Sequence, residues 1–260
     1  MAFYNENHIA HFDGEKQKIQ QLYEDLLLSY GSLALSNKFA RELVTQGFLR
    51  RVSVLRRCVD NVFRIIPPDY VGLPSKDELR DCEINLHAFY LSVFGCFENL
   101  ALVWVHERSI RKKNGNPLAP MQIGFGEKYA EVRASLSPDF LQYLTSKTMT
   151  EWFAYLENYR HALAHRIPLY IPPDAIPPEK VERWNELERA SGEAVRRLDL
   201  DEHDRLQSEQ KTLGFFHPSI RHSYEEKSSG ILFHPQLLID FKTVEEFANR
   251  MLKEFKQPLP

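Results

Sequence analysis

The predicted architecture depends most on SKDELRDCEINLHAFYLSVFGCFENLALVWV, residues 75–105. It opens with Ser75 and Glu78, and a serine followed three residues later by a glutamate is the pattern of a helix capping box. Apolar residues then alternate at steps of three and four: Leu79, Cys82, Leu86, Phe89, Val93, Cys96, Leu100 and Val103. A seam of this length predicts one long helix inside an antiparallel helical bundle.

Further helices are predicted on both sides of this stretch. Before it, we expect a helix capped by Asp13 that ends near Gly31, and a second helix over about residues 38–66. After it, helix-opening caps are expected at Ser137, at Thr148 with Glu151, and at Thr243 with Glu246. Five prolines in residues 167–178 predict an extended segment there.

The chain divides into three parts, which together are expected to form one compact, mainly α domain. Residues 1–178 hold the bundle. Residues 179–211 carry ten acidic and seven basic side chains and are predicted to form a charged helical insertion. Residues 212–260 form a small extension that packs on the bundle, in which Phe216-His217-Pro218 and Phe233-His234-Pro235 bracket Lys227-Ser228-Ser229-Gly230 and suggest a short hairpin.

Composition places the protein among soluble globular proteins. Of its 260 residues 43% are hydrophobic, enough to bury a core, and the formal charge of -3 means that nucleic-acid binding would need a local basic patch. Three cysteines without a Cys-x-x-Cys pair argue against a disulfide framework and a cysteine zinc site. No signal peptide and no uncharged apolar run long enough for a membrane helix is visible, so we expect a cytoplasmic protein without membrane contact.

Residues 157–168, ENYRHALAHRIP, concentrate chemically active side chains at the end of a predicted helix. Arg160, His161 and His165 fall in its last turns, and Pro168 stops it. A histidine can take or give a proton near neutral pH, while an arginine stays charged and stabilises a developing phosphate anion. These are the two groups that cleavage of RNA without a metal requires.

This segment resembles the motif of the HEPN superfamily, in which an arginine, a polar residue, three further residues and a histidine end a helix of an all-helical bundle. The resemblance covers residues 38–170. It implies a metal-independent endoribonuclease without cofactors, of the kind found in toxin–antitoxin, phage-defence and RNA-processing systems. It also implies a homodimer with both motifs on one cleft, and an antitoxin or other regulatory protein as partner. His165 would transfer protons, Arg160 would stabilise the phosphate, and His161 would support them.

Two other interpretations of the same segment stay open. Five helical steps place Arg160 and His165 ~140° apart on a straight helix. The basic side chains could therefore simply complement the dipole at a helix C-terminus. His161 and His165 lie four residues apart, as in a His-x3-His zinc pair, but Ala162 stands where such a motif has glutamate and no third ligand is near in sequence, so no metal is expected.

Other residues are candidates for support and for RNA binding. Glu98 is the one Asp, Glu, Lys or Arg between Glu83 and Glu107. A charge in such an apolar stretch needs a partner, so Glu98, together with Asn99, could orient Arg160 or His165. The alternatives for Glu98 are a structural ion pair and a position at a gap in the bundle surface. The candidates for contact with an RNA backbone are Arg50, Arg57, Arg64 and Arg166. The first three recur every seven residues, a spacing for which the solvated face of an amphipathic helix is the commoner explanation.

Two rival functions remain. The first is a non-catalytic helical module that binds RNA, a nucleotide or a partner protein through the same region. The second is a scaffolding protein that uses the charged residues 179–211 as its contact surface. Turnover of RNA separates the ribonuclease from the first, and removal of residues 179–211 tests the second.

Overall fold

The computed structural model describes residues 2–223, 225 and 230–257 and is mainly α. Its central element is α4 (Lys76–Glu107), which begins at the predicted capping box. The backbone N–H of Glu78 donates to Ser75 Oγ at 3.2 Å, and the backbone N–H of Ser75 donates to a Glu78 carboxylate oxygen at 2.8 Å. Every position of the predicted seam is buried: Leu79, Cys82, Leu86, Phe89, Val93, Cys96, Leu100 and Val103. The predicted long core helix is therefore confirmed.

The predicted helix over residues 38–66 is present but not uniform. It consists of α2 (Lys38–Glu42), the π-helical segment η1 (Leu43–Phe48) and α3 (Leu49–Ile65). The wide turn passes Gly47 close to α4, where a Cβ atom would lie 3.0 Å from the Asn99 side chain. A π-helical turn inserts an extra residue into a helix, and apolar periodicity alone does not reveal it.

Two helices begin earlier than predicted. α1 (Glu6–Gly31) is capped by Asn5 rather than by Asp13, although it ends at Gly31 as expected. α10 (Phe233–Lys256) starts without a side-chain cap, and Thr243 lies inside it, where its hydroxyl donates to the Ile239 carbonyl. Both predicted caps were therefore wrong, because Ser, Thr and Asp also occur inside helices, where the hydroxyls can bond to the preceding turn.

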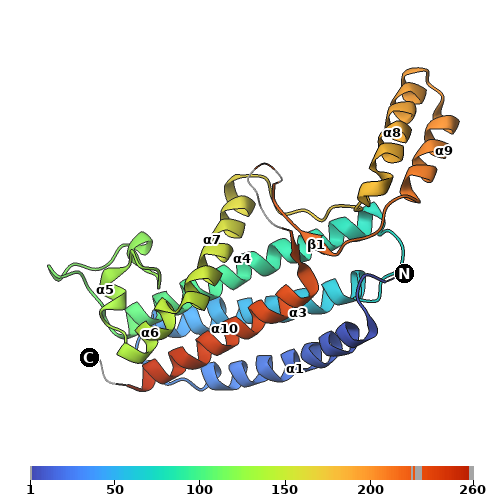
Figure 1. Ribbon diagram of the computed structural model, residues 1–260. Coiled ribbons are helices and arrows are strands. Elements are labelled where there is room, and N and C mark those ends of the chain that lie inside the picture. The colour runs from blue at the N-terminus through green and yellow to red at the C-terminus, as the bar shows by residue number, and fades with distance from the viewer. Residues whose placement is uncertain (1, 224, 226–229, 258–260) are drawn as a thin grey trace.

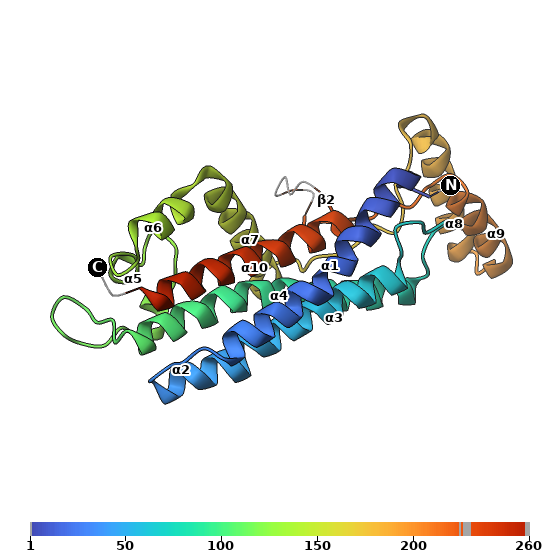
Figure 2. The same cartoon turned by 90° about the horizontal axis from the view of Figure 1, so that it is seen from below.

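α1, α3, α4 and α10 lie side by side as the body of the molecule (Figures 1 and 2). The Tyr30 hydroxyl of α1 donates to the Ala248 carbonyl of α10 at 2.8 Å and ties the first helix to the last. The elements between α4 and the charged insertion are η2 (Pro120–Gln122), α5 (Ala130–Arg133), α6 (Pro138–Thr145) and α7 (Lys147–His165). Ser137 caps α6 as predicted.

The charged insertion forms a helical hairpin that projects from the bundle (Figure 1). It contains η3 (Pro178–Lys180), α8 (Val181–Arg196) and α9 (Leu200–Lys211). Its small core, built on Leu187, Ala194 and Leu206, is separate from the core of the bundle. The two helices thus pack on each other rather than on the bundle body.

The C-terminal extension contains the suggested hairpin. β1 (Ser219–Ile220) pairs antiparallel with β2 (Ile231–Leu232), with Ser219 opposite Leu232. Of the segment proposed to connect them, residues 227–229 lie outside the described part of the chain. The His234 ring donates from Nε2 to the Ile66 carbonyl at 2.7 Å, which anchors the start of α10 to the end of α3.

Cysteines and apolar runs agree with a core rather than with a membrane. Cys58, Cys82 and Cys96 are free and buried. Within the described residues, α4 is the one helix long and apolar enough to cross a membrane, but 67% of its most apolar window is buried inside the protein. That degree of burial is typical of the core helix of a soluble protein.

Candidate functional site

The motif lies at the C-terminal end of α7, a helix that rises from the bundle (Figure 1). Ser146 caps this helix by accepting from the backbone N–H of Met149, so the predicted cap at Thr148 lies two residues inside the helix and was wrong. The buried side of α7 consists of Met149, Trp152, Leu156, Tyr159 and Ala162. The helix ends at His165, because Arg166 has an extended backbone and Pro168 follows.

Arg160 is held against α4. Its guanidinium lies over the ring of Phe94, with 5.2 Å between the guanidinium carbon and the ring centroid. A cation over an aromatic face is attracted to the ring while it keeps its hydrogen-bond donors free. Arg160 is half-buried, and no hydrogen bond or ion pair ties its donors to another of the described residues. The donors are therefore available to an anionic ligand.

His161 and His165 form a row with Glu157 along the outer side of α7. The His161 Nε2 atom lies 3.6 Å from a Glu157 carboxylate oxygen, and the two imidazole centroids are 6.2 Å apart. His161 is half-exposed and His165 is exposed. The row presents two imidazoles to solvent, and Glu157 restrains the first of them.

The structure does not bring Arg160 and His165 together in one chain. α7 remains helical through His165, so the two residues keep the ~140° separation of a regular helix. No hydrogen bond or ring contact joins them in the described part of the chain. A site that uses both groups on one phosphate must therefore be completed by side-chain movement or by a second copy.

Arg166 turns back along the motif helix. One guanidinium nitrogen donates to the Asn158 carbonyl at 3.2 Å and to the Asn158 side-chain oxygen at 2.7 Å. The Asn158 amide in turn contacts His222 Nε2 at 3.1 Å, and the His222 ring is buried. This chain of contacts fixes the end of α7 against the segment after β1. Neither Asn158 nor His222 has a spacing in the sequence that predicts such a contact.

The chain that leaves the motif is fastened to α4. The His87 ring donates from Nε2 to the Leu169 carbonyl at 2.6 Å. The backbone N–H of Ile171 donates to a Glu83 carboxylate oxygen at 2.9 Å, and Glu83 is buried. Together with the isolated antiparallel bridge between Tyr170 and Arg221, these anchors hold the proline-rich segment in an extended course after α7.

Glu98 does not have the expected relation to the motif. Its side chain is exposed and makes no ion pair or hydrogen bond with any described residue, so it supports neither Arg160 nor His165 in this structure. Its exposure agrees with the alternative interpretation, in which Glu98 lies at a gap in the bundle surface. Glu98 instead stands at the rim of a pocket.

Asn99 is engaged elsewhere. Its side-chain oxygen accepts from Arg51 Nε at 2.9 Å, so it faces α3 rather than the motif helix. The Arg51 guanidinium covers Gly95, where a Cβ atom would lie 2.3 Å from the guanidinium carbon. Arg51 is half-buried and had no distinguishing signal in the sequence, because it lies beside the more regular arginine series.

The arginine series itself lies on solvent-facing α3. Arg50, Arg57 and Arg64 are all exposed, and Arg50 makes one long contact of 3.4 Å to Gln46. They form a basic line on one helix, as the spacing predicts. Both α3 and α7 pack on α4, so the arginine line and the motif belong to different helices of the bundle.

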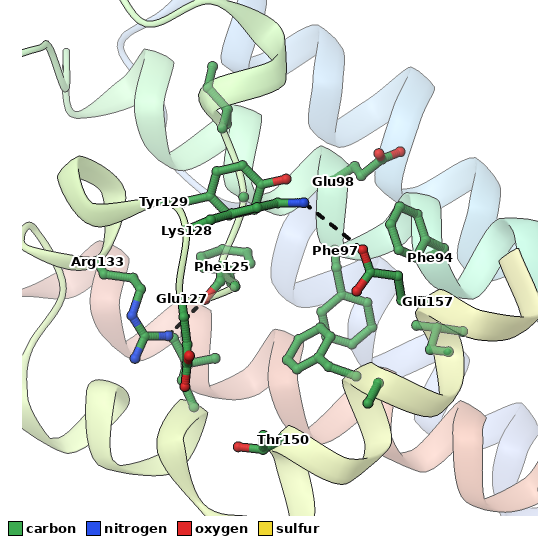
Figure 3. Close-up of a pocket in the computed structure, with 17 residues that line it drawn as sticks. Phe94, Phe97, Glu98, Phe125, Glu127, Lys128, Tyr129, Arg133, Thr150 and Glu157 are labelled. Carbon is green, nitrogen blue, oxygen red and sulfur yellow. Dashed lines mark hydrogen bonds and ion pairs between the residues drawn. The ribbon is translucent and has the colours of Figure 1, made fainter. Parts of the chain in front are cut away.

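A pocket of about 370 Å³ lies beside the motif (Figure 3). Its aromatic walls are Phe94, Phe97, Phe125, Tyr129 and Phe153. The Arg160 guanidinium lies over the ring of Phe94, and Glu157 of the motif helix also lines the pocket. Lys128 reaches across the mouth to within 4.0 Å of a Glu157 carboxylate oxygen. No pattern in the sequence indicates this pocket, because its walls come from segments that are far apart along the chain.

Behind the motif helix lies a fully buried carboxylate, Asp240 of α10. It accepts from Trp152 Nε1 at 2.7 Å, from Gln236 Nε2 at 2.8 Å and from the Tyr155 hydroxyl at 3.1 Å. Burial raises the Asp240 pKa to about 6, and the three hydrogen bonds oppose that rise. The network ties α7 to α10 from the inside.

Comparisons of this chain with family models, curated proteins and solved structures give no match. Within the described residues, no group of three or more His, Cys, Asp or Glu side chains gathers in a way that could hold a metal ion. The motif at the end of α7 and the adjoining pocket are therefore the observations on which a function can be argued.

Proposed function

We propose that the protein is a metal-independent endoribonuclease of the HEPN type that acts in the cytoplasm, in a defence, toxin–antitoxin or RNA-processing system. The observation that carries this proposal is the C-terminal end of α7, where the donors of Arg160 are unoccupied and two accessible imidazoles lie on another side of the same helix. These side chains match the chemistry of the Arg-polar-x3-His motif that the segment resembles.

The reaction is an internal transesterification of RNA. The ribose 2′-oxygen attacks the neighbouring phosphorus while the bond from phosphorus to the 5′-oxygen breaks. His165 takes the proton of the 2′-hydroxyl or gives one to the departing 5′-oxygen, since an imidazole serves either role near neutral pH. Arg160 neutralises the extra charge on the phosphorane, and His161 adds a further polar contact. The products are a 2′,3′-cyclic phosphate and a 5′-hydroxyl.

The separation of Arg160 and His165 on α7 favours a homodimer. Two copies that meet through the ends of α7 would place His165 of one copy near Arg160 of the other, on a single phosphate. In the same assembly, Arg50, Arg57, Arg64 and Arg166 would contact the RNA backbone. Because phosphate contacts release counterions, RNA affinity should then fall steeply as salt rises. An antitoxin or regulatory protein would act by covering the α7 ends.

The test is cleavage of single-stranded RNA in the presence of EDTA. The His165→Ala and Arg160→Ala variants should each lose roughly 100-fold or more of the rate, the usual contribution of a proton-transfer group for His165 and of a charge stabiliser for Arg160. Matched controls are His11→Ala in α1 and Arg196→Ala in α8, both exposed and remote from the motif. Cleaved ends should carry cyclic phosphates. The proposal fails if wild type and His165→Ala are equally active or equally inert on varied RNAs.

One observation favours a second candidate function, a non-catalytic helical module. Arg160 is already held on Phe94 beside a pocket, an arrangement that serves binding without requiring His165. This candidate predicts RNA or nucleotide binding without turnover. Arg160→Ala would then weaken affinity, whereas His165→Ala would change little.

A further inference from the structure

The pocket beside the motif has aromatic faces on several sides (Figure 3). The Phe97 and Phe153 rings pack edge to face with 5.2 Å between centroids. Phe125 is buried and contributes a wall from the loop that follows α4. At about 370 Å³, the pocket is at the lower end of the range for small-molecule sites, about 300–1,000 Å³. It suits a single flat ring system better than a large ligand.

The loop that carries Phe125 is held in place by close packing at Gly124 and by a hydrogen bond from Arg133. The Tyr129 ring lies so close to Gly124 that a Cβ atom there would stand 2.3 Å from it. The Arg133 guanidinium donates to the Phe125 carbonyl at 2.9 Å and fixes the same loop from the other end. The pocket is thus preformed, because contacts on both sides of Phe125 hold its loop in place.

Among the described residues, the charged groups of the pocket without a partner are carboxylates. Glu98 and Glu127 line it without an ion pair or hydrogen bond to any of the described residues. Its two cations are already engaged, Lys128 with Glu157 and Arg133 with the Phe125 carbonyl. Free carboxylates at the edge of an aromatic slot accept from N–H groups on the rim of a flat ligand.

The pocket and the motif share walls. The Arg160 guanidinium stacks on the Phe94 ring, and Phe94 also lines the pocket. Glu157 likewise lines the pocket and contacts His161 at 3.6 Å. A ligand whose ring enters the pocket and whose phosphate stays outside would therefore meet Arg160 with that phosphate.

We propose that the pocket binds one nucleobase that carries an exocyclic amino group, in the RNA strand whose phosphate lies at Arg160. This inference rests on the proposed function, which supplies the RNA. Stacking on aromatic side chains accepts any base. The selection comes from a carboxylate at the pocket edge. Glu98 and Glu127 stand on opposite sides of the pocket (Figure 3), so the amino group donates to one of them. Cytosine has that group where uracil has a carbonyl oxygen, so uracil is disfavoured.

The experiment measures mononucleotide binding by calorimetry, in the His165→Ala background so that turnover plays no part. CMP should bind roughly tenfold or more tightly than UMP, and Glu98→Gln with Glu127→Gln should remove that preference. Ala154→Leu fills the pocket from the exposed side of α7 with a good helix former and should weaken CMP binding roughly tenfold. Ala10→Leu on exposed α1 is the matched control and should leave binding unchanged.

RNA cleavage by the protein with His165 intact separates the two proposals. If CMP binds and Ala154→Leu weakens that binding, the pocket proposal is supported even if no RNA is cleaved, in which case the ribonuclease proposal alone fails. Cleavage that proceeds without CMP binding, and without any change of cleavage position in Ala154→Leu, overturns the pocket proposal alone. Equal binding of CMP and UMP overturns the selection by Glu98 and Glu127.

Discussion

At the scale of single residues, Asp240 links the acid–base behaviour of the core to the motif helix. Its carboxylate is fully buried, with Trp152 and Tyr155 of α7 as two of its three donors. The Asp240 pKa is raised to about 6 from an ordinary value of 3.8. A raised carboxyl pKa means that the folded state binds the proton more tightly than the unfolded state. Its contribution to stability is complete below pH 3.8 and is lost as pH rises through 6.

Asp240→Asn should remove this pH dependence. Asparagine keeps an oxygen for Trp152 and Gln236 but cannot ionise, so the variant imitates the protonated carboxyl. Relative to wild type, its free energy of unfolding should rise by about 3 kcal/mol between pH 4 and pH 7, at 1.36 kcal/mol per pKa unit. Urea unfolding at several pH values, followed by circular dichroism, measures the difference. The exposed Asp25→Asn is the control, and a pH-independent gap for Asp240→Asn would contradict the prediction.

Candidate residues that are close together in the sequence were predictable. Residues whose contacts lie on other helices or segments of the bundle were not. Arg160, His161 and His165 stand out because they are neighbours in sequence at a helix end. Arg51 and His222 matter through partners on other elements, Asn99 for the first and Asn158 for the second. Their partners lie 48 and 64 residues away along the chain, a separation at which one sequence carries no signal.

At the scale of elements, apolar periodicity predicted the helices well and their ends poorly. The seam of α4 was predicted position by position because burial selects apolar residues directly. Caps depend on a single polar side chain, and several candidates compete near each helix start. For α4 the right serine stands alone after a proline, whereas before α7 both Ser146 and Thr148 qualify.

The caps of α7 can be tested as a matched pair. Ser146→Ala should lower the free energy of unfolding by about 1 kcal/mol, since the backbone N–H of Met149 loses its acceptor. Thr148→Ala should stay within about 0.5 kcal/mol of wild type, because that exposed side chain is already inside the helix. Thermal and urea unfolding of both variants give the comparison. A larger loss for Thr148→Ala would mean that α7 starts where the sequence pattern placed it.

At the scale of the whole molecule, the site combines segments that the sequence keeps apart. The pocket needs α4, the loop before α5, and α7, which come together only when the bundle folds. Its volume depends on how those segments pack, and periodicity says nothing about that. The charged insertion is different, because its composition alone predicted a charged helical segment.

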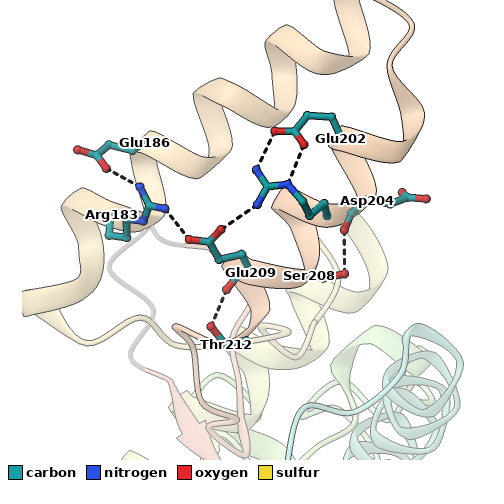
Figure 4. A network of polar contacts seen from close by, with 8 residues as sticks. Arg183, Glu186, Glu202, Asp204, Ser208, Glu209 and Thr212 are labelled. Carbon is teal, nitrogen blue, oxygen red and sulfur yellow. Dashed lines mark hydrogen bonds and ion pairs between the residues drawn. The ribbon is translucent and has the colours of Figure 1, made fainter.

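The insertion is joined to the bundle through a narrow neck. Ala175 and Phe215 exchange backbone hydrogen bonds of 2.8 and 3.0 Å, so the two ends of the hairpin lie side by side. Beyond the neck, Arg183 pairs with Glu186 and with Glu209, and Arg205 joins the same Glu209 to Glu202 (Figure 4). These exposed pairs run along and between α8 and α9, and exposed pairs contribute little to stability.

Replacing residues 176–214 by an Asn-Gly turn should therefore leave the bundle folded. The paired neck already has the geometry that a two-residue turn closes, and the core of the hairpin is separate from that of the bundle. The melting temperature should change by no more than about 3 °C, and RNA cleavage in EDTA should persist, because the motif and the pocket lie outside the deleted residues. If the bundle stays folded but cleavage is lost, the hairpin carries part of the substrate contact. If the bundle unfolds, α8 and α9 are part of its folding unit. The stability of the bundle then depends on the hairpin although their cores are separate.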